Sequence, residues 1–255
     1  MRHATQADLA AVTETISLAF HDDPTWSWGF PDPLTRQEQY AAFWRFMIGG
    51  ALRYPWVLMT ESCEAAAVWI PPGGTELGEE DEERLGELLD GLVGERAGDV
   101  LELFRRFDAV HPHAEPHYYL SLLGTHPSHT GRGVGMALLA ECLARIDGER
   151  MPAYLESSNP ANNHRYQRHG FDAIGEFYLP GSDIPVLPRR GVGRLILSLY
   201  EAAATADGFT RLELMSTLSG EPLYTAYGFG TARAADRHHR WSRCATRPDG
   251  ESRRP

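Results

Sequence analysis

A glycine-rich turn between an apolar strand and an amphipathic helix is the segment of this chain best suited to chemistry. It is the run LLGTHPSHTGRGVGMALL at positions 122–139. Gly131, Gly133 and Gly135 let the backbone approach an anion, and a helix that begins near Gly133 directs free N–H groups and the positive end of its dipole at it. The spacing predicts a phosphate-binding loop, although glycine clusters before helices also serve simple tight turns.

A second candidate segment follows about twenty residues later. The strand-like run AYLESS, residues 153–158, carries Glu156 and leads into NPANNHRYQRHGF, residues 159–171. This order places Tyr166 on a short helix that ends before Gly170 and Phe171. This second segment agrees with the first in its order of strand, turn and helix.

These segments resemble the GNAT superfamily of N-acetyltransferases, whose signature is Gln/Arg-x-x-Gly-x-Gly/Ala after the fourth strand and Asn…Tyr…Gly-Phe after the fifth. The resemblance covers most of residues 1–188 and is greatest to the antibiotic-modifying branch that includes puromycin N-acetyltransferase. It implies an α/β fold of the α+β type, with a mixed, mostly antiparallel twisted sheet and helices on both faces. Thr130 stands where the signature has Gln or Arg, so we expect weaker pyrophosphate binding.

The resemblance implies acetyl-CoA as the cosubstrate. Its pantetheine arm would lie beside the strand 119–125, where a backbone N–H would polarise the thioester carbonyl. The residues expected to contact it are Leu122, Leu123, Thr125, Thr130, Gly131, Arg132, Gly133, Val134, Gly135, Met136, Asn159 and Asn162. The two asparagines also suit turns and helix caps.

The implied reaction is transfer of an acetyl group to the primary amine of a small molecule, such as an antibiotic, by direct attack in a ternary complex. Glu156 is the candidate general base, or else a structural carboxylate that caps the next turn or pairs with an arginine. Tyr166 stands where the family's general acid protonates the departing thiolate, or else packs under Phe171. The alternative from another class is a protein that binds CoA or sequesters a ligand without catalysis.

The connection HDDPTWSWGFPD, residues 21–32, is predicted to be a loop that carries three aromatic residues and two carboxylates. Its rings could fill one end of the core. They could also form an acceptor site with aromatic walls and carboxylates for an ammonium group. The resemblance favours the acceptor site, whose candidate residues are Asp22, Asp23, Trp26, Trp28 and Phe30.

The remaining clusters of polar residues predict exposed segments and not catalytic or metal-binding sites. His111, His113 and His117 surround two prolines at spacings that fit no metal site well, so we expect them on a loop surface and expect no metal. Six carboxylates between Glu76 and Glu83 precede a run of leucines, which is typical of a solvated helix start.

Composition narrows the possible partners. The formal net charge is −11 and every one of the 24 basic residues is arginine, which argues against nucleic acid and suits a cationic acceptor. The three cysteines are far apart, which predicts a reduced, cytoplasmic setting. We also expect no membrane association, since neither a signal peptide nor a membrane-spanning apolar run is found.

Periodicity predicts helices over residues 6–20, from 35 to about 50, around 85–92 and over 97–107, with a hairpin at 56–60 and 65–70. Only four residues precede the first helix, where the GNAT family has a full strand. We therefore expect either a very short first strand or a start that lies upstream.

The end of the chain repeats part of its middle. A shift of 58 residues places RGVG at 132–135 on RGVG at 190–193, and Tyr166 on Tyr224. The expected organisation is an acetyltransferase domain at 1–188, an incomplete GNAT-like α/β half-domain at 189–240 and a disordered tail at 241–255. Leu214 replaces Glu156 in the copy, so we expect one active site per chain and a structural appendage, able to form a homodimer.

Overall fold

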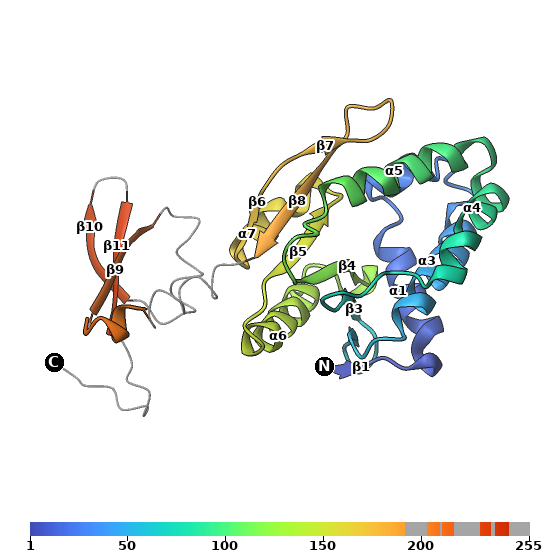
Figure 1. The fold of residues 1–255 in the computed structure, drawn as a ribbon. Coiled ribbons are helices and arrows are strands. Elements are labelled where there is room, and N and C mark those ends of the chain that lie inside the picture. Colours follow the sequence, from blue (N-terminus) through green and yellow to red (C-terminus); the bar gives the residue numbers. More distant parts are fainter. Residues whose placement is uncertain (192–202, 210, 217–229, 236–237, 245–255) are drawn as a thin grey trace. The chain divides into compact units, whose positions relative to one another are not determined.

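The computed structural model describes residues 1–191, 203–209, 211–216, 230–235 and 238–244 (Figure 1). The chain divides into two units. The first comprises Met1–Asn162 and Ala173–Arg189, and the second comprises Asn163–Asp172 and Arg190–Pro255. Within the described residues, no helix is long and apolar enough to cross a membrane.

The first unit is built on a mixed, mostly antiparallel sheet with strand order β1-β2-β3-β4-β5-β8, and β7 pairs with β8. The pairs β1–β2, β2–β3 and β3–β4 are antiparallel, whereas β4 and β5 are parallel. The strands are β1 (Arg2–His3), β2 (Val57–Met59), β3 (Ala65–Ile70), β4 (Tyr118–Thr125), β5 (Ala153–Ser157), β7 (Phe177–Tyr178) and β8 (Pro185–Gly191). The expected fold class is confirmed, and the first strand is very short.

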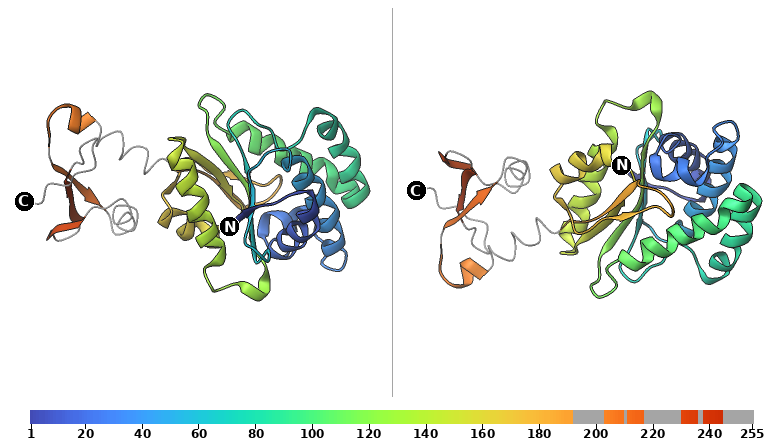
Figure 2. Two further views of the ribbon diagram at one scale, coloured as in Figure 1. Left: turned by 90° about the horizontal axis from the view of Figure 1, so that it is seen from below. Right: turned by 90° about the horizontal axis from the view of Figure 1, so that it is seen from above.

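Helices cover both faces of this sheet. Figure 2 shows α6 on one face and α1 and α3 on the other. The helices are α1 (Leu9–Ala19), α2 (Pro24–Gly29), α3 (Arg36–Ala51), α4 (Glu79–Val93), α5 (Ala97–Val110) and α6 (Val134–Gly148). Short 3₁₀ turns are η1 (Gln6–Asp8), η2 (Gly94–Arg96), η3 (Pro127–His129) and η4 (Pro160–Asn162).

The predicted first helix forms for local reasons. Thr5 and Asp8 make a capping box, in which the backbone N–H of Thr5 donates to the Asp8 carboxylate over 2.9 Å. Leu9, Val12 and Ile16 repeat at helical spacing and are buried against the sheet. Burial of this stripe fixes α1 over β3 and β4.

The expectation of a loop at residues 21–32 is wrong for Pro24–Gly29, which form α2. Asp23 caps this helix, and its Oδ1 accepts from the N–H groups of Thr25 and Trp26 over 3.0 and 3.2 Å. Pro24 occupies the first helical position, where its fixed φ is favourable and its missing N–H costs nothing.

The second unit contains α7 (Asn163–Arg168), most of β6 (Phe171–Ala173) and a three-stranded antiparallel sheet of order β10-β11-β9. Those strands are β9 (Arg211–Ser216), β10 (Gly230–Ala235) and β11 (His238–Cys244). The disordered tail expected from residue 241 is therefore wrong for residues 241–244. Residues 245–255 and the repeat positions 192, 193 and Tyr224 lie outside the described residues.

Candidate active site

Strands β4 and β5 separate part-way along the sheet. Their parallel pairing joins residues 118–120 to residues 153–155, and β4 then continues to Thr125 beside β3 alone. We call this separation the fork. The β5-facing edge of β4 beyond Leu120 presents backbone donors and acceptors that a strand-like ligand can use. This edge carries Leu122, Leu123 and Thr125, the residues expected beside a pantetheine arm, and that contact stays a prediction.

The glycine-rich turn joins the end of β4 to α6, as the sequence predicts. Gly131 and Gly133 have φ values of +77° and +75°, a region that side chains disfavour. A Cβ on Gly135 would lie 2.3 Å from Thr125 Oγ1, so glycine allows α6 to approach β4. The Thr130 hydroxyl donates to the Pro127 carbonyl over 2.9 Å and serves the turn itself.

This turn has the chemistry that a diphosphate needs. Arg132 is exposed beside it, and the first N–H groups of α6, from Val134, Gly135 and Met136, have no acceptor within their own helix. Buried side chains of α6, including Leu138 and Cys142, hold the helix against the sheet. Binding of acetyl-CoA by these residues fits the geometry and stays a prediction.

Glu156 lies at the fork, one residue beyond the last pair of β4 with β5. Its side chain is only 3% exposed. Among the described residues its Oε1 has no hydrogen-bond partner, and His111 Nδ1 is 3.7 Å away. A buried carboxylate oxygen without a donor is costly, so this atom suits a ligand that brings an N–H donor or a positive charge.

A chain of two histidines extends from Glu156. His111 Nε2 lies 3.0 Å from His117 Nε2, and His117 Nδ1 lies 2.8 Å from the carbonyl oxygen of Glu115. The expectation of a loop surface is wrong for His111 and His117, which are half-buried, and holds for the exposed His113. Within the part of the chain that is described, no cluster of His, Cys, Asp and Glu is arranged to hold a metal ion.

Glu76 brings a second carboxylate to the same place. It accepts a hydrogen bond from the Ser121 hydroxyl on β4. Burial, with the nearby charge of Glu156 as a smaller contribution, raises the pKa of Glu76 to about 7. The expected solvated helix start is thus wrong for Glu76, although residues 79–83 do form the acidic first turns of α4.

Two buried tyrosines face Glu156. Burial raises the pKa of Tyr119 and of Tyr154, and the neighbouring Glu156 carboxylate raises both further. Both phenols therefore stay neutral at physiological pH. Their rings pack edge-on against His111, with centroids 5.0 and 4.9 Å away, which fixes the plane of the imidazole.

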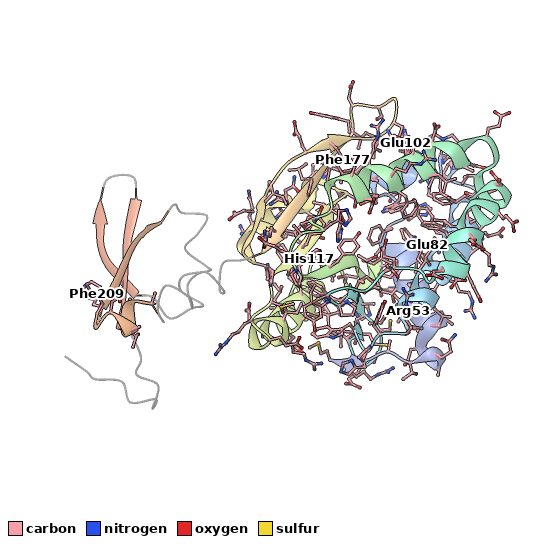
Figure 3. All side chains as sticks on the ribbon, viewed as in Figure 1. Arg53, Glu82, Glu102, His117, Phe177 and Phe209 are labelled. Atoms are coloured by element: carbon pink, nitrogen blue, oxygen red, sulfur yellow. The ribbon has the colours of Figure 1, made fainter. Side chains whose placement is uncertain are left out.

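Most of these groups line a cavity of 1290 Å³. Elements β3, α3, α4 and α5 contribute much of its apolar lining, which includes Met47, Ile70, Leu85, Leu101, Phe104 and Phe107. Its polar wall includes Glu76, His111, His117, Tyr119 and Glu156. Figure 3 labels two of the lining residues, His117 before β4 and Glu82 on α4. The arrangement suits a cationic ligand with an apolar body.

The aromatic residues of the 21–32 segment lie elsewhere. Trp26 packs on Trp44 with ring centroids 4.7 Å apart, and Phe30 is fully buried against Tyr40 and Phe43. The guanidinium of Arg96 lies 4.5 Å above the ring of Trp28.

The two aspartates of that segment have different surroundings. Asp23 caps α2 and accepts from the Ser158 hydroxyl over 2.8 Å, whereas the Asp22 side chain is 93% exposed. All five candidate acceptor residues are described and stand outside the lining of the cavity. Their packing favours the structural alternative, and acceptor binding by them stays a prediction.

Tyr166 belongs to the second unit, on α7, so its approach to Glu156 stays a prediction. Its ring lies edge-on to Phe171 with centroids 6.2 Å apart, the contact that the structural alternative requires. Asn159 Oδ1 accepts from the Ala161 N–H over 3.0 Å, and the Asn162 N–H donates to the Asn159 carbonyl over 2.9 Å. Both asparagines thus shape the turn after β5.

Sequence reasoning missed His111, His117 and Glu76 as site residues. The available signal was weak, because each lies in a segment whose path depends on distant contacts. Arg53, for example, fixes the segment that carries Glu76 by donating to the carbonyls of Glu76 and Leu77 over 3.1 and 2.8 Å.

Comparison with known proteins identifies the domain. A model of the acetyltransferase (GNAT) family matches residues 73–171, which include the fork, the turn and Glu156. A solved structure from Corynebacterium glutamicum, described as "histone acetyltransferase HPA2 and related acetyltransferase", is similar at 25% identity and a TM-score of 0.54, over 74% of this chain and 93% of that one. Arylalkylamine N-acetyltransferase 2 from Aedes aegypti has a similar fold, at 13% identity and a TM-score of 0.50, over 74% of this chain and 95% of the other. Residues 73–171 therefore match the acetyltransferase (GNAT) family, and this match together with the similar folds supports an acyltransferase enzyme.

Proposed function

We propose that the enzyme uses acetyl-CoA to acetylate the primary amine of a small cationic molecule, and that the amine binds in the cavity beside Glu156. The observation that carries this proposal is Glu156, which lines the cavity and whose buried Oε1 lacks a hydrogen-bond partner among the described residues. An ammonium group supplies both the charge and the N–H donors that this oxygen lacks.

The cavity walls support a cation with an apolar body. The charge of Glu156 contributes to the raised pKa of Glu76. A bound ammonium would offset that charge and favour the ionised form of Glu76. Phe104 and Phe107 of α5 add apolar surface to the same cavity. An antibiotic amine of the puromycin type is one candidate within this class.

Acetyl-CoA supplies a thioester whose C–S bond breaks as the C–N bond of the amide forms. Glu156 removes one proton from the ammonium so that a neutral amine is available. The nitrogen loses a second proton as the amide forms, and the departing thiolate gains one proton. Tyr166 is the proposed donor of the proton to the thiolate. The β4 backbone at the fork would hold the reacting carbonyl, and one proton is released to water for each amide formed.

The test is thiol release from acetyl-CoA by the purified protein, measured across aminonucleosides, aminoglycosides, polyamines, arylalkylamines and short peptides. With an accepted amine, Glu156→Gln should lower kcat about 100-fold or more, because it removes the proton acceptor but keeps the shape. Binding of acetyl-CoA should be unchanged.

Glu87→Gln is the matched control, since Glu87 is exposed on α4 and stands outside the cavity lining. It removes the same charge from the same unit and should leave kcat unaltered. A Glu156→Gln enzyme with wild-type kcat would contradict the base role. Acetyl-CoA binding without thiol release for any amine would contradict the proposed reaction.

A further inference from the structure

We infer that His111 is the proton acceptor behind Glu156, and that His117 fixes the His111 tautomer that allows this. The inference rests on the proposed function and deepens it. Glu156 touches the amine, whereas His111 and His117 act through Glu156 and are positioning residues.

The direction of the hydrogen bonds follows from the carbonyl of Glu115. A carbonyl oxygen only accepts, so His117 Nδ1, at 2.8 Å, must donate to it. In a neutral imidazole the other nitrogen is then an acceptor. His117 Nε2 therefore accepts, and His111 Nε2, at 3.0 Å, must donate to it. The proton on His111 is thereby assigned to the nitrogen that points away from Glu156.

His111 Nδ1, the nitrogen that faces Glu156, therefore carries no proton in the neutral ring. With its proton on Nε2, neutral His111 directs the lone pair of Nδ1 at Glu156 Oε1, which is 3.7 Å away and has no donor among the described residues. Two lone pairs that face each other in a buried site repel, and one proton between them removes the repulsion. Glu156 and His111 thus bind a single proton in common, as one dyad.

The separation of 3.7 Å is longer than a formed hydrogen bond. Catalytic hydrogen bonds are often long before the substrate binds and shorten in the complex. The dyad therefore takes its proton from the bound ammonium, which enters through Glu156 Oε1 and passes to His111 Nδ1. The imidazolium keeps its Nε2–H bond to His117.

The groups packed around His111 are consistent with this role. Glu156 and Glu76 are the carboxylates near it, and Tyr119 and Tyr154 contribute neutral phenols whose rings contact the imidazole. The ring of His113 lies 5.5 Å away. That histidine is directed to Asp108, with its Nε2 at 2.9 Å from the backbone oxygen and 3.6 Å from Oδ1.

The proton can leave without a change of tautomer. The His111 side chain is 23% exposed, so water reaches the ring once the product has left. Loss of the Nδ1 proton to water restores the starting state, with Nε2–H still donated to His117. One proton enters the dyad and one leaves it in each turnover.

The first test needs no activity. Long-range ¹H–¹⁵N spectra of the full chain, with His111→Gln and His117→Gln used for assignment, report which imidazole nitrogen carries a proton. We expect His117 to carry its proton on Nδ1 in the neutral protein. A neutral His117 with its proton on Nε2 would overturn the inference.

The second test is the pH profile of kcat with an accepted amine. His111→Gln should lower kcat about 10- to 100-fold with KM within about threefold, and should move the acidic limb to lower pH by about one unit, because the glutamine amide donates to Glu156 and leaves a weaker base. His117→Gln should lower kcat less. His3→Gln, on the exposed surface of β1, is the control.

The outcomes separate the inference from the proposed function. A reduced kcat with an unmoved acidic limb would mean that His111 is merely structural, and would overturn the inference. If no amine is acetylated by the wild-type protein, the proposed function fails, whereas the nitrogen spectra still decide the tautomer of His117.

Discussion

Glu76 should make the first unit less stable as the pH rises, and Glu76→Gln should remove that loss. The carboxyl group is held against Ser121 and close to Glu156, and burial raises its pKa from 4.5 to about 7. Glutamine has the same shape and keeps an oxygen for the Ser121 hydroxyl, but it never ionises.

Proton linkage gives the sign and the size of the pH-dependent change in unfolding free energy. The folded protein holds the Glu76 proton more tightly than the unfolded chain, so the stabilising contribution is complete below pH 4.5 and is lost as the pH rises to about 7. A shift of this size corresponds to about 3 kcal/mol as an order of magnitude. Glu76→Gln should therefore match the wild type near pH 4.5 and exceed its stability by up to about 3 kcal/mol at pH 8.

The assay is urea unfolding of both proteins between pH 4.5 and 8, followed by tryptophan fluorescence. This signal reports mainly the first unit, since Trp241 is the only tryptophan outside it. The measured quantity is the difference in unfolding free energy at each pH. Glu80→Gln, which removes an exposed carboxylate from the first turn of α4, is the control for net charge.

The control should change stability by less than about 0.5 kcal/mol throughout, as surface substitutions usually do. The reasoning is refuted if the difference between wild type and Glu76→Gln stays constant across this pH range. It is also refuted if Glu76→Gln is the less stable protein at pH 8, since that would mean that the ionised form is stabilised by the fold.

Two further predictions concern the elements that hold the site. Gly135→Ala should destabilise the protein by about 1 kcal/mol or more, because its Cβ would lie 2.3 Å from Thr125 Oγ1, whereas Gly91→Ala, with open space around its Cβ, should be neutral or stabilising in the same thermal unfolding experiment. Arg53→Met should cost about 1 kcal/mol and reduce kcat, because the segment that carries Glu76 loses its donor; an unchanged melting temperature together with unchanged kcat would contradict that positioning role.

The sequence determined the parts of the protein whose structure depends on neighbouring residues. The capping box at Thr5 and Asp8, the apolar stripe of α1 and the glycines at 131 and 133 specify helices and a turn through contacts and dihedral preferences within a few residues. The order of strand, turn and helix over residues 122–139 could therefore be predicted. Glu156 could be named for the same reason, since its strand is followed by a recognisable turn.

The tertiary structure alone decided which side chains meet Glu156. Glu76 and His111 come from segments that are joined to the site only by long-range packing, through Arg53, Tyr119 and neighbouring side chains. It also decided that the rings of Trp26 and Phe30 lie in the core, because they pack against Trp44 and Tyr40 of α3, contacts that sequence periodicity cannot predict. Local preferences fix the elements of this enzyme, whereas packing between distant segments assembles its polar cavity.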